Sequence, residues 1–331
     1  MNYRSLLSDE SAAPEEQKAF VALENKKTGL PVQFTGNHGL TSKFNKKGER
    51  KNYGLTILTQ ENSAENEIKY ELAVTCLGIN EESTISYQIE RTGPVYINEL
   101  EPDLVADKLA YEAGKIFYPL TIETDKEGRF LGVKNINEIR KRWPKAKEKI
   151  TDYFEGEYVS KYLGLMEERL ADDDFIQLIF RDDWFIKVYF QAIYRNYTET
   201  LTVEEYLNFP ILQPWVSGYK TIEKVNQYTN HFGSVEVNHQ GELIQDEENS
   251  MTGNYEARYV LNAASKAIQI IIAEWTCKDL TEKRIVFKLF TRDGIETGNV
   301  QTNISPSEVD SLVFIDGRKN TGKTSFWEKW F

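Results

Sequence analysis

Apolar and polar residues alternate with a period of two in a first block of the chain, which begins at Tyr53. The apolar positions of the segments EIKYELAVTCLG and STISYQIER are Ile68, Tyr70, Leu72, Val74, Cys76, Ile85, Tyr87 and Ile89. Such alternation is typical of antiparallel strands that bury one face and expose the other. The polar segments QENSAEN and GINEE favour hairpin connections between these strands.

The middle of the chain changes to helical spacing. A first helix is expected after Pro102 and Asp103, and a hairpin that turns at Asp125–Gly128 follows it. Asn135 and Glu138 then have the spacing of a capping pair. The helix behind them carries Ile136, Ile139, Trp143, Ala146 and Ile150 on one face, and Pro144 predicts a kink or an interruption in it. Val159, Tyr162, Met166 and Leu170 predict a further helix.

Residues 175–194 form the most apolar stretch of this length. As a helix they would leave only a narrow polar stripe, which predicts burial on most sides. As strands they would turn at Arg181–Asp183. We favour the helix, because Asp172, Asp173 and Asp174 provide an acidic N-terminal cap.

Strand patterns return after Thr198 and persist. The candidate strands are FPILQPW, SGYKTIEKVNQY, SVEVNHQGELIQD, NYEARYVLN, AIQIIIAEWTC and RIVFKLFTRDG, with turns at Asn238–Gly241 and Arg292–Gly294. The order strands, helices, strands does not alternate as βαβ units do. We therefore expect an α+β fold: a large curved or split antiparallel sheet with a mid-chain helical block.

The expected organisation is a polar, mobile leader over residues 1–52 and a single α+β domain over residues 53–331. Within that domain we expect strands over 53–134, helices over about 136–195 and strands over 200–331. Residues 1–51 carry nine basic and six acidic residues, while the rest carries 31 and 46. An acidic body repels phosphate backbones, which argues against nucleic acid and anionic membranes as partners.

Near its C-terminus the chain contains GRKNTGKT, a match to the phosphate-binding pattern G-x-x-x-x-G-K-[ST]. A phosphate site would use Gly317, Gly322, Lys323 and Thr324. Because such a loop needs a following helix and an acidic residue for Mg²⁺, we expect a turn here instead. The last residues include Phe326, Trp327, Trp330 and Phe331, which we expect to dock on this chain or on a partner.

Other candidate chemistry is sparse. His231 and His239 are roughly 25 Å apart if they flank a strand, and His38 lies in the leader, so each is expected at the surface or in a loop. The acidic triplet at 172–174 and the acidic pair at 182–183 favour helix capping over metal binding. Cys76 and Cys277 could form one disulfide, but buried thiols in a reducing compartment are favoured. No catalytic residue, metal or cofactor is predicted.

Residues 117–143, with the aromatic-rich stretch around Arg181–Phe185, resemble a pattern found in uncharacterised β-rich proteins of Bacteroidota. More remotely, the order strands, helices, strands over residues 66–195 resembles bacterial lipoprotein carriers. This second resemblance implies a curved antiparallel sheet that holds acyl chains against central helices. Neither resemblance implies particular site residues.

The first hypothesis for function is a non-enzymatic module of the bacterial cytoplasm that binds another protein, such as an immunity protein, an adaptor or an assembly accessory. The acidic body, the abundant aromatics and the missing catalytic motifs favour it. The second hypothesis is a carrier of an apolar ligand held between sheet and helices. The third is a nucleotide or phosphate binder that uses Lys323. The N-terminus lacks an apolar signal-peptide core, and no apolar run is long enough to span a membrane.

Overall fold

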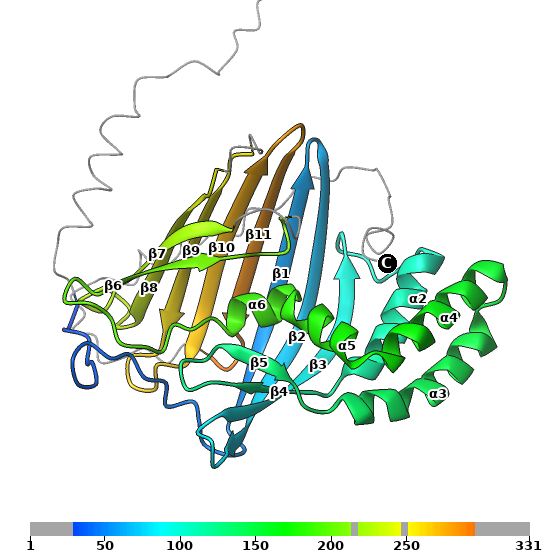
Figure 1. Ribbon diagram of the computed structural model, residues 1–331, viewed down its shortest axis with the longest axis horizontal. Helices are drawn as coiled ribbons and strands as arrows, with labels where there is room; N and C mark the ends of the chain where they lie inside the picture. Colours follow the sequence, from blue (N-terminus) through cyan, green and yellow to red (C-terminus); the bar gives the residue numbers. More distant parts are fainter. Residues whose placement is uncertain (1–28, 213–217, 246–250, 295–331) are drawn as a thin grey trace, which may run out of the picture.

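The computed structural model describes residues 29–212, 218–245 and 251–294, and its central feature is one antiparallel sheet (Figure 1). In chain order the strands are β1 (Arg50–Glu61), β2 (Ala64–Ile79), β3 (Ile85–Ile97), β4 (Leu120–Thr124), β5 (Phe130–Val133), β6 (Thr202–Leu207), β7 (Tyr219–Val225), β8 (Val235–Leu243), β9 (Asn254–Leu261), β10 (Ile268–Lys278) and β11 (Glu282–Thr291). In space their order is β5-β4-β3-β2-β1-β11-β10-β9-β8-β7-β6.

The first and last of these strands pair with each other. The register of β1 with β11 runs from Tyr53 opposite Thr291 to Glu61 opposite Lys283. This pairing joins the two alternating blocks of the sequence into a single sheet. The α+β fold with a large antiparallel sheet, expected from the sequence, is therefore confirmed, and the sheet is not split.

The described helices lie between β3 and β6 in the chain. They are α2 (Val105–Gly114), the 3₁₀ turn η1 (Lys115–Phe117), α3 (Ile136–Tyr153), α4 (Glu157–Ala171), α5 (Asp173–Arg181) and α6 (Trp184–Tyr189). In Figure 1, α2 to α5 gather beside β3, and α6 lies across the middle of the sheet. Trp184 of α6 packs 4.9 Å from Trp275 of β10, measured between ring centroids.

The apolar stretch 175–194 is helical, as predicted, but it forms two helices. The Asp172 carboxylate accepts hydrogen bonds from the amides of Asp174 and Phe175 and so caps α5. The helix α5 ends at Arg181, and Asp183 accepts a hydrogen bond of 2.9 Å from the amide of Ile186 at the start of α6. Acidic residues at both positions therefore act as helix caps, as the sequence predicted.

The start of α3 and the expected interruption at Pro144 differ from the prediction. Asn135 does not cap α3 with its side chain. Its Oδ1 accepts from the amide of Thr121, and its Nδ2 donates to the carbonyl of Pro119. The side chain thus ties the helix start to β4. Of the two alternatives for Pro144, the interruption is excluded, because α3 continues through it to Tyr153.

Three expectations for the second block of strands also need correction. Residues 209–212, the described part of FPILQPW, form a turn, and Phe209 packs between Tyr255 and Trp275. Residues 238–241 lie inside β8 rather than in a turn. The strand β6 had no counterpart among the predicted strands. Its residues 202–207 contain two adjacent glutamates, which hide the alternation.

The sheet buries one face against the helices. Buried positions alternate along β7 and β8, at Tyr219, Thr221, Glu223, Val225, Val235, Val237, His239, Gly241 and Leu243. Residues 29–49 also pack against the body: Val32, Leu40 and Phe44 are buried, and the amide of Leu40 donates to the carbonyl of Arg195. The described part of the expected leader therefore belongs to the α+β body.

Candidate functional site

The residues singled out at the C-terminus lie outside the described residues. These are Gly317, Gly322, Lys323 and Thr324 of the phosphate-binding pattern and the aromatics Phe326, Trp327, Trp330 and Phe331. Within residues 29–212, 218–245 and 251–294, no group of three or more His, Cys, Asp or Glu side chains could hold a metal ion. No described helix is long and apolar enough to cross a bilayer.

A partly open apolar cavity of about 380 Å³ lies between the sheet and the helices. Its floor is formed by β1, β2 and β3, through Ile57, Ile68, Tyr70 and Val95 among others. Its walls and roof come from α2, η1, α4 and α5, including Ala110, Phe117, Met166, Leu170, Phe175, Ile176, Ile179 and Phe180.

The sequence places these side chains on the cavity in two ways. Alternation along β2 directs Ile68 and Tyr70 to the same face as the core residue Leu72. Helical spacing brings Met166 and Leu170 of α4, four residues apart, onto one face. The cavity is thus lined by the continuation of the two patterns that build the core.

One positive charge stands on the sheet side of this cavity. The guanidinium of Arg91 lies 5.1 Å from the ring centroid of Tyr70 and 4.6 Å from that of Tyr118. Its Nη2 donates to the Tyr118 hydroxyl at 3.5 Å, the limit of a hydrogen bond, and its buried Nε has no partner. No carboxylate of the described residues lies within 4.0 Å of this guanidinium.

Arg91 directly precedes an irregularity in β3. Tyr70 pairs with Val95 and Leu72 pairs with Arg91, so β3 advances further than β2 between these two pairs. The inserted residues include Pro94, which cannot donate to the strand ladder. Bulges of this kind bend a strand and change the direction of the side chains beside them. Both residues that flank the irregularity, Arg91 and Val95, line the cavity.

Asp183 is the acidic group whose charge acts on Arg91. It lines the cavity, and one of its oxygens is engaged by the Ile186 amide. Burial raises the pKa of Asp183, while the amides of α6 and the charge of Arg91 act in the opposite direction. Asp183 is therefore committed to the start of α6 and does not form an ion pair with Arg91.

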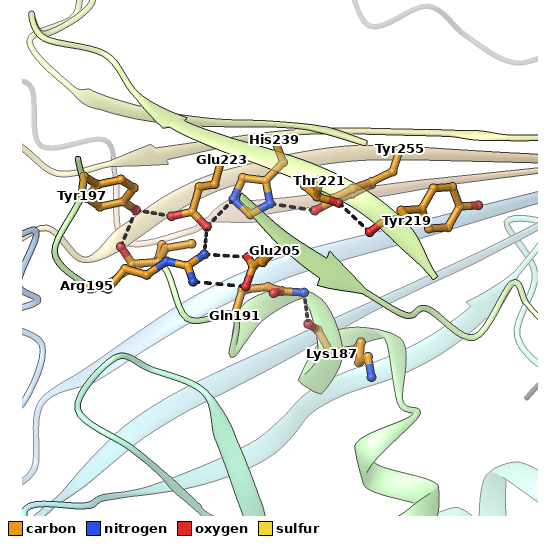
Figure 2. Close-up of polar contacts among 11 residues, drawn as sticks. Lys187, Gln191, Arg195, Tyr197, Glu205, Tyr219, Thr221, Glu223, His239 and Tyr255 are labelled. Atoms are coloured by element: carbon orange, nitrogen blue, oxygen red, sulfur yellow. Dashed lines mark hydrogen bonds and ion pairs between the residues drawn. The ribbon is translucent and has the colours of Figure 1, made fainter. Parts of the chain in front are cut away.

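A second group of polar residues is buried at the other end of the sheet (Figure 2). We call it the polar cluster: Arg195, Tyr197, Glu205 of β6, Glu223 of β7, His239 of β8 and Tyr255 of β9. The Arg195 guanidinium contacts both Glu205 oxygens, at 3.1 and 2.6 Å, and Glu223 Oε2 at 2.5 Å. The Tyr197 hydroxyl contacts the other oxygen of Glu223.

The imidazole of His239 extends the polar cluster to β9. Its Nδ1 lies 3.1 Å from the Tyr255 hydroxyl, and its Nε2 lies 3.3 Å from Glu223 Oε2, without the geometry of a hydrogen bond. Burial lowers the pKa of His239 to about 3, so the ring is neutral at pH 7. Burial also raises the pKa of Glu223, against the opposing charge of Arg195.

The polar cluster is best explained as a structural link. It connects the segment after α6, which carries Arg195 and Tyr197, to four neighbouring strands. None of its six residues lines the apolar cavity. Arg195 is paired with the two carboxylates of the cluster, although its buried Nε has no hydrogen-bond partner.

The histidine expectations are partly wrong. His38 lies in a turn, and His231 is exposed in a turn, as expected. His239, expected at the surface or in a loop, is buried inside β8 with 1% of its surface exposed. Cys76 and Cys277 are both free and buried, as expected.

The burial of Arg91 and of the charged members of the polar cluster, and the position of Asp183 on the cavity, were not predicted from the sequence. A signal exists for Arg91 and His239, because each continues a buried alternation in which a polar residue is out of place. Arg91 follows Tyr87 and Ile89, and His239 follows Val235 and Val237, in steps of two.

No protein-family model matches this chain, and no curated protein matches it either.

Proposed function

We propose that the protein binds an apolar ligand, such as an alkyl or acyl chain, in the cavity between β1–β3 and the helices α2, α4 and α5. The cavity itself carries this proposal. Its volume of about 380 Å³ lies within the range of small-molecule sites, roughly 300–1,000 Å³. Its lining is largely aliphatic and aromatic, with few polar groups to orient a ligand.

Physical cost supports a ligand-binding role for this space. Protein interiors are packed as densely as organic crystals, and an empty cavity loses dispersion contacts on every wall. Apolar cavities of roughly 150 Å³ stay dry and take up apolar molecules. The cavity here is larger and is bounded by helices whose aromatic residues could have filled it. A chain-like ligand would restore the missing contacts.

The interaction-module hypothesis, which the sequence placed first, stays an untested prediction. A filled core built on Phe175, Phe180, Trp184, Phe185 and Tyr189 would favour an interaction module. Phe180, Trp184, Phe185 and Tyr189 are buried in the core and Phe175 is half-buried, while Phe175, Phe180 and Trp184 also line the cavity. Filling of the core therefore does not separate the two hypotheses, and the preference for ligand binding rests on the cavity alone.

Titration calorimetry with decanol, a neutral chain, tests the proposal. Gly114 lines the cavity at the end of α2, and a Cβ at this position would meet no atom within 4 Å. Gly114→Leu should therefore fill the cavity and weaken decanol binding at least about tenfold. Gly164→Leu is the matched control, because Gly164 of α4 is equally unobstructed but does not line the cavity.

Wild type and Gly164→Leu should bind decanol with equal affinity. Absence of decanol binding by wild type would contradict the proposal. Equal binding by Gly114→Leu would place the ligand elsewhere and would also contradict it. Circular dichroism of both variants checks that the fold is unchanged.

A further inference from the structure

We infer that the ligand carries an anionic head group, a carboxylate or a phosphate, and that Arg91 binds it inside the cavity. This inference rests on the proposed function and adds the chemical class of the ligand. It depends on the hydrogen-bonding and charge balance of Arg91, on the supports around its guanidinium and on the dimensions of the cavity.

The hydrogen-bonding capacity of Arg91 is largely unused. A guanidinium has five N–H donors. Among the described residues, Arg91 has a single acceptor, the Tyr118 hydroxyl at 3.5 Å, and its Nε has none. Buried polar groups are nearly always hydrogen-bonded, so this deficit calls for an acceptor from outside the chain. Carboxylate and phosphate oxygens match the fork of a guanidinium best.

The positive charge is also incompletely compensated. Tyr70 and Tyr118 are neutral, because burial raises the pKa of both hydroxyls. Asp183 is held by the start of α6 and lies more than 4.0 Å from the guanidinium. Asp182, the other acidic residue on the cavity, is 3.8 Å from Arg181. A bound anion would supply the missing counter-charge in a setting where solvent screening is weak.

The two tyrosines prepare the guanidinium for such a ligand. The Cζ atom of Arg91 lies 5.1 Å from the ring centroid of Tyr70 and 4.6 Å from that of Tyr118. Cation–π contacts of this kind hold the planar group in place without using its donors. Arg91 is therefore positioned in advance, and little side-chain entropy is lost when an anion binds.

The volume sets the length of the chain. A cavity of about 380 Å³ holds about a dozen groups of the size of a water molecule, which is close to that of a methylene. Decanoate, with twelve non-hydrogen atoms, fits this limit. Affinity should rise about fourfold for each added methylene and then level off once the chain exceeds about a dozen groups.

Calorimetry with three ligands of equal chain length tests the inference: decanol, decanoate and decyl phosphate. Wild type should bind at least one of the two anions about tenfold to hundredfold more tightly than decanol, since hydrogen bonds to charged groups are strong. The tighter anion identifies the head group. In Arg91→Gln this preference should vanish, and Arg91→Lys should retain part of it. The preference should persist at high salt.

Arg169→Gln is the matched control, because Arg169 also lines the cavity but is exposed and stacks on Phe175 at 4.6 Å. It should lower anion affinity only slightly. If wild type binds decanol but neither anion more tightly, this inference is overturned and the proposed function stands. A preference that survives in Arg91→Gln also overturns it. If no ligand binds, the proposed function and this inference both fall.

Discussion

Replacing Arg195 with methionine should lower the free energy of unfolding by about 3–5 kcal/mol, the cost of breaking a buried ion pair from one side. The Arg195 side chain is 10% exposed, and its guanidinium contacts the carboxylates of Glu205 and Glu223, whose side chains are 15% and 0% exposed. Methionine fills a similar volume but supplies no donor. Both carboxylates would then be left in the interior without their counter-charge.

Urea denaturation measures this loss, provided that the dependence on urea concentration keeps its slope. Arg284→Met is the matched control. Arg284 also contacts both oxygens of one carboxylate, Glu274, at 2.6 and 2.8 Å, but the side chains are 39% and 42% exposed. Removal of such an exposed pair should cost at most about 1 kcal/mol.

A double variant separates stranded charge from lost packing. Adding Glu223→Gln to Arg195→Met removes one of the stranded carboxylates, so part of the lost stability should return. If Arg195→Met costs no more than Arg284→Met, then the polar cluster does not stabilise the sheet and our reading of it is wrong.

Three further predictions concern single groups. The folded-state pKa of His239 is about 3, below its ordinary value, so its contribution to stability is present above pH 6.5 and is lost as the pH falls. Wild type should therefore lose about 2 kcal/mol of unfolding free energy from this group between pH 6.5 and 5. A His239→Gln variant with the same pH dependence would contradict this. Asp172→Ala should cost about 1 kcal/mol by urea denaturation because α5 loses its cap, whereas an unchanged midpoint would show that the cap is dispensable. In ATP and Mg²⁺, Lys323→Ala should have the same melting temperature as wild type. If the nucleotide stabilises wild type but not the variant, the phosphate-binding hypothesis is supported instead.

Much of the fold could be predicted from local patterns. The alternation from Ile68 to Cys76 identifies the buried face of β2, and the hairpin that turns at Asp125–Gly128 appears where its residues predict it. Gly128 has φ +92°, a conformation that glycine adopts without strain. These elements follow from nearest neighbours in the chain, so one sequence is enough to place them.

The charged groups could not be predicted in this way, because tertiary contacts override the local preference. On β7, Ile222 is 46% exposed while its neighbour Glu223 is fully buried. A pattern of apolar residues would assign the opposite faces. The burial of Glu223 depends on Arg195, which lies 28 residues earlier, and on His239 of the next strand. The pairing of β7 with β8 places His239 opposite Glu223, and the segment between α6 and β6 brings Arg195 to both.

Packing between separate elements also explains why a space for an apolar ligand between sheet and helices was only the second hypothesis from the sequence. The floor of the cavity comes from three strands near the start of the chain, and its roof comes from helices that follow in sequence. The sequence shows that Tyr70 and Met166 are apolar and face inward. It does not show that the layers they belong to leave a space between them, because that depends on how closely whole elements approach.

The central claim is that an apolar ligand occupies this cavity, and methyl-labelled methionine gives the most direct test. The chain has three methionines, of which Met166 lines the cavity and Met251 does not. Saturating decanol should shift the ¹³C-methyl NMR signal of Met166 and give nuclear Overhauser contacts between that methyl and the alkyl chain, while the Met251 signal stays in place. A Met166 signal that does not move and shows no contact with the ligand would contradict the account.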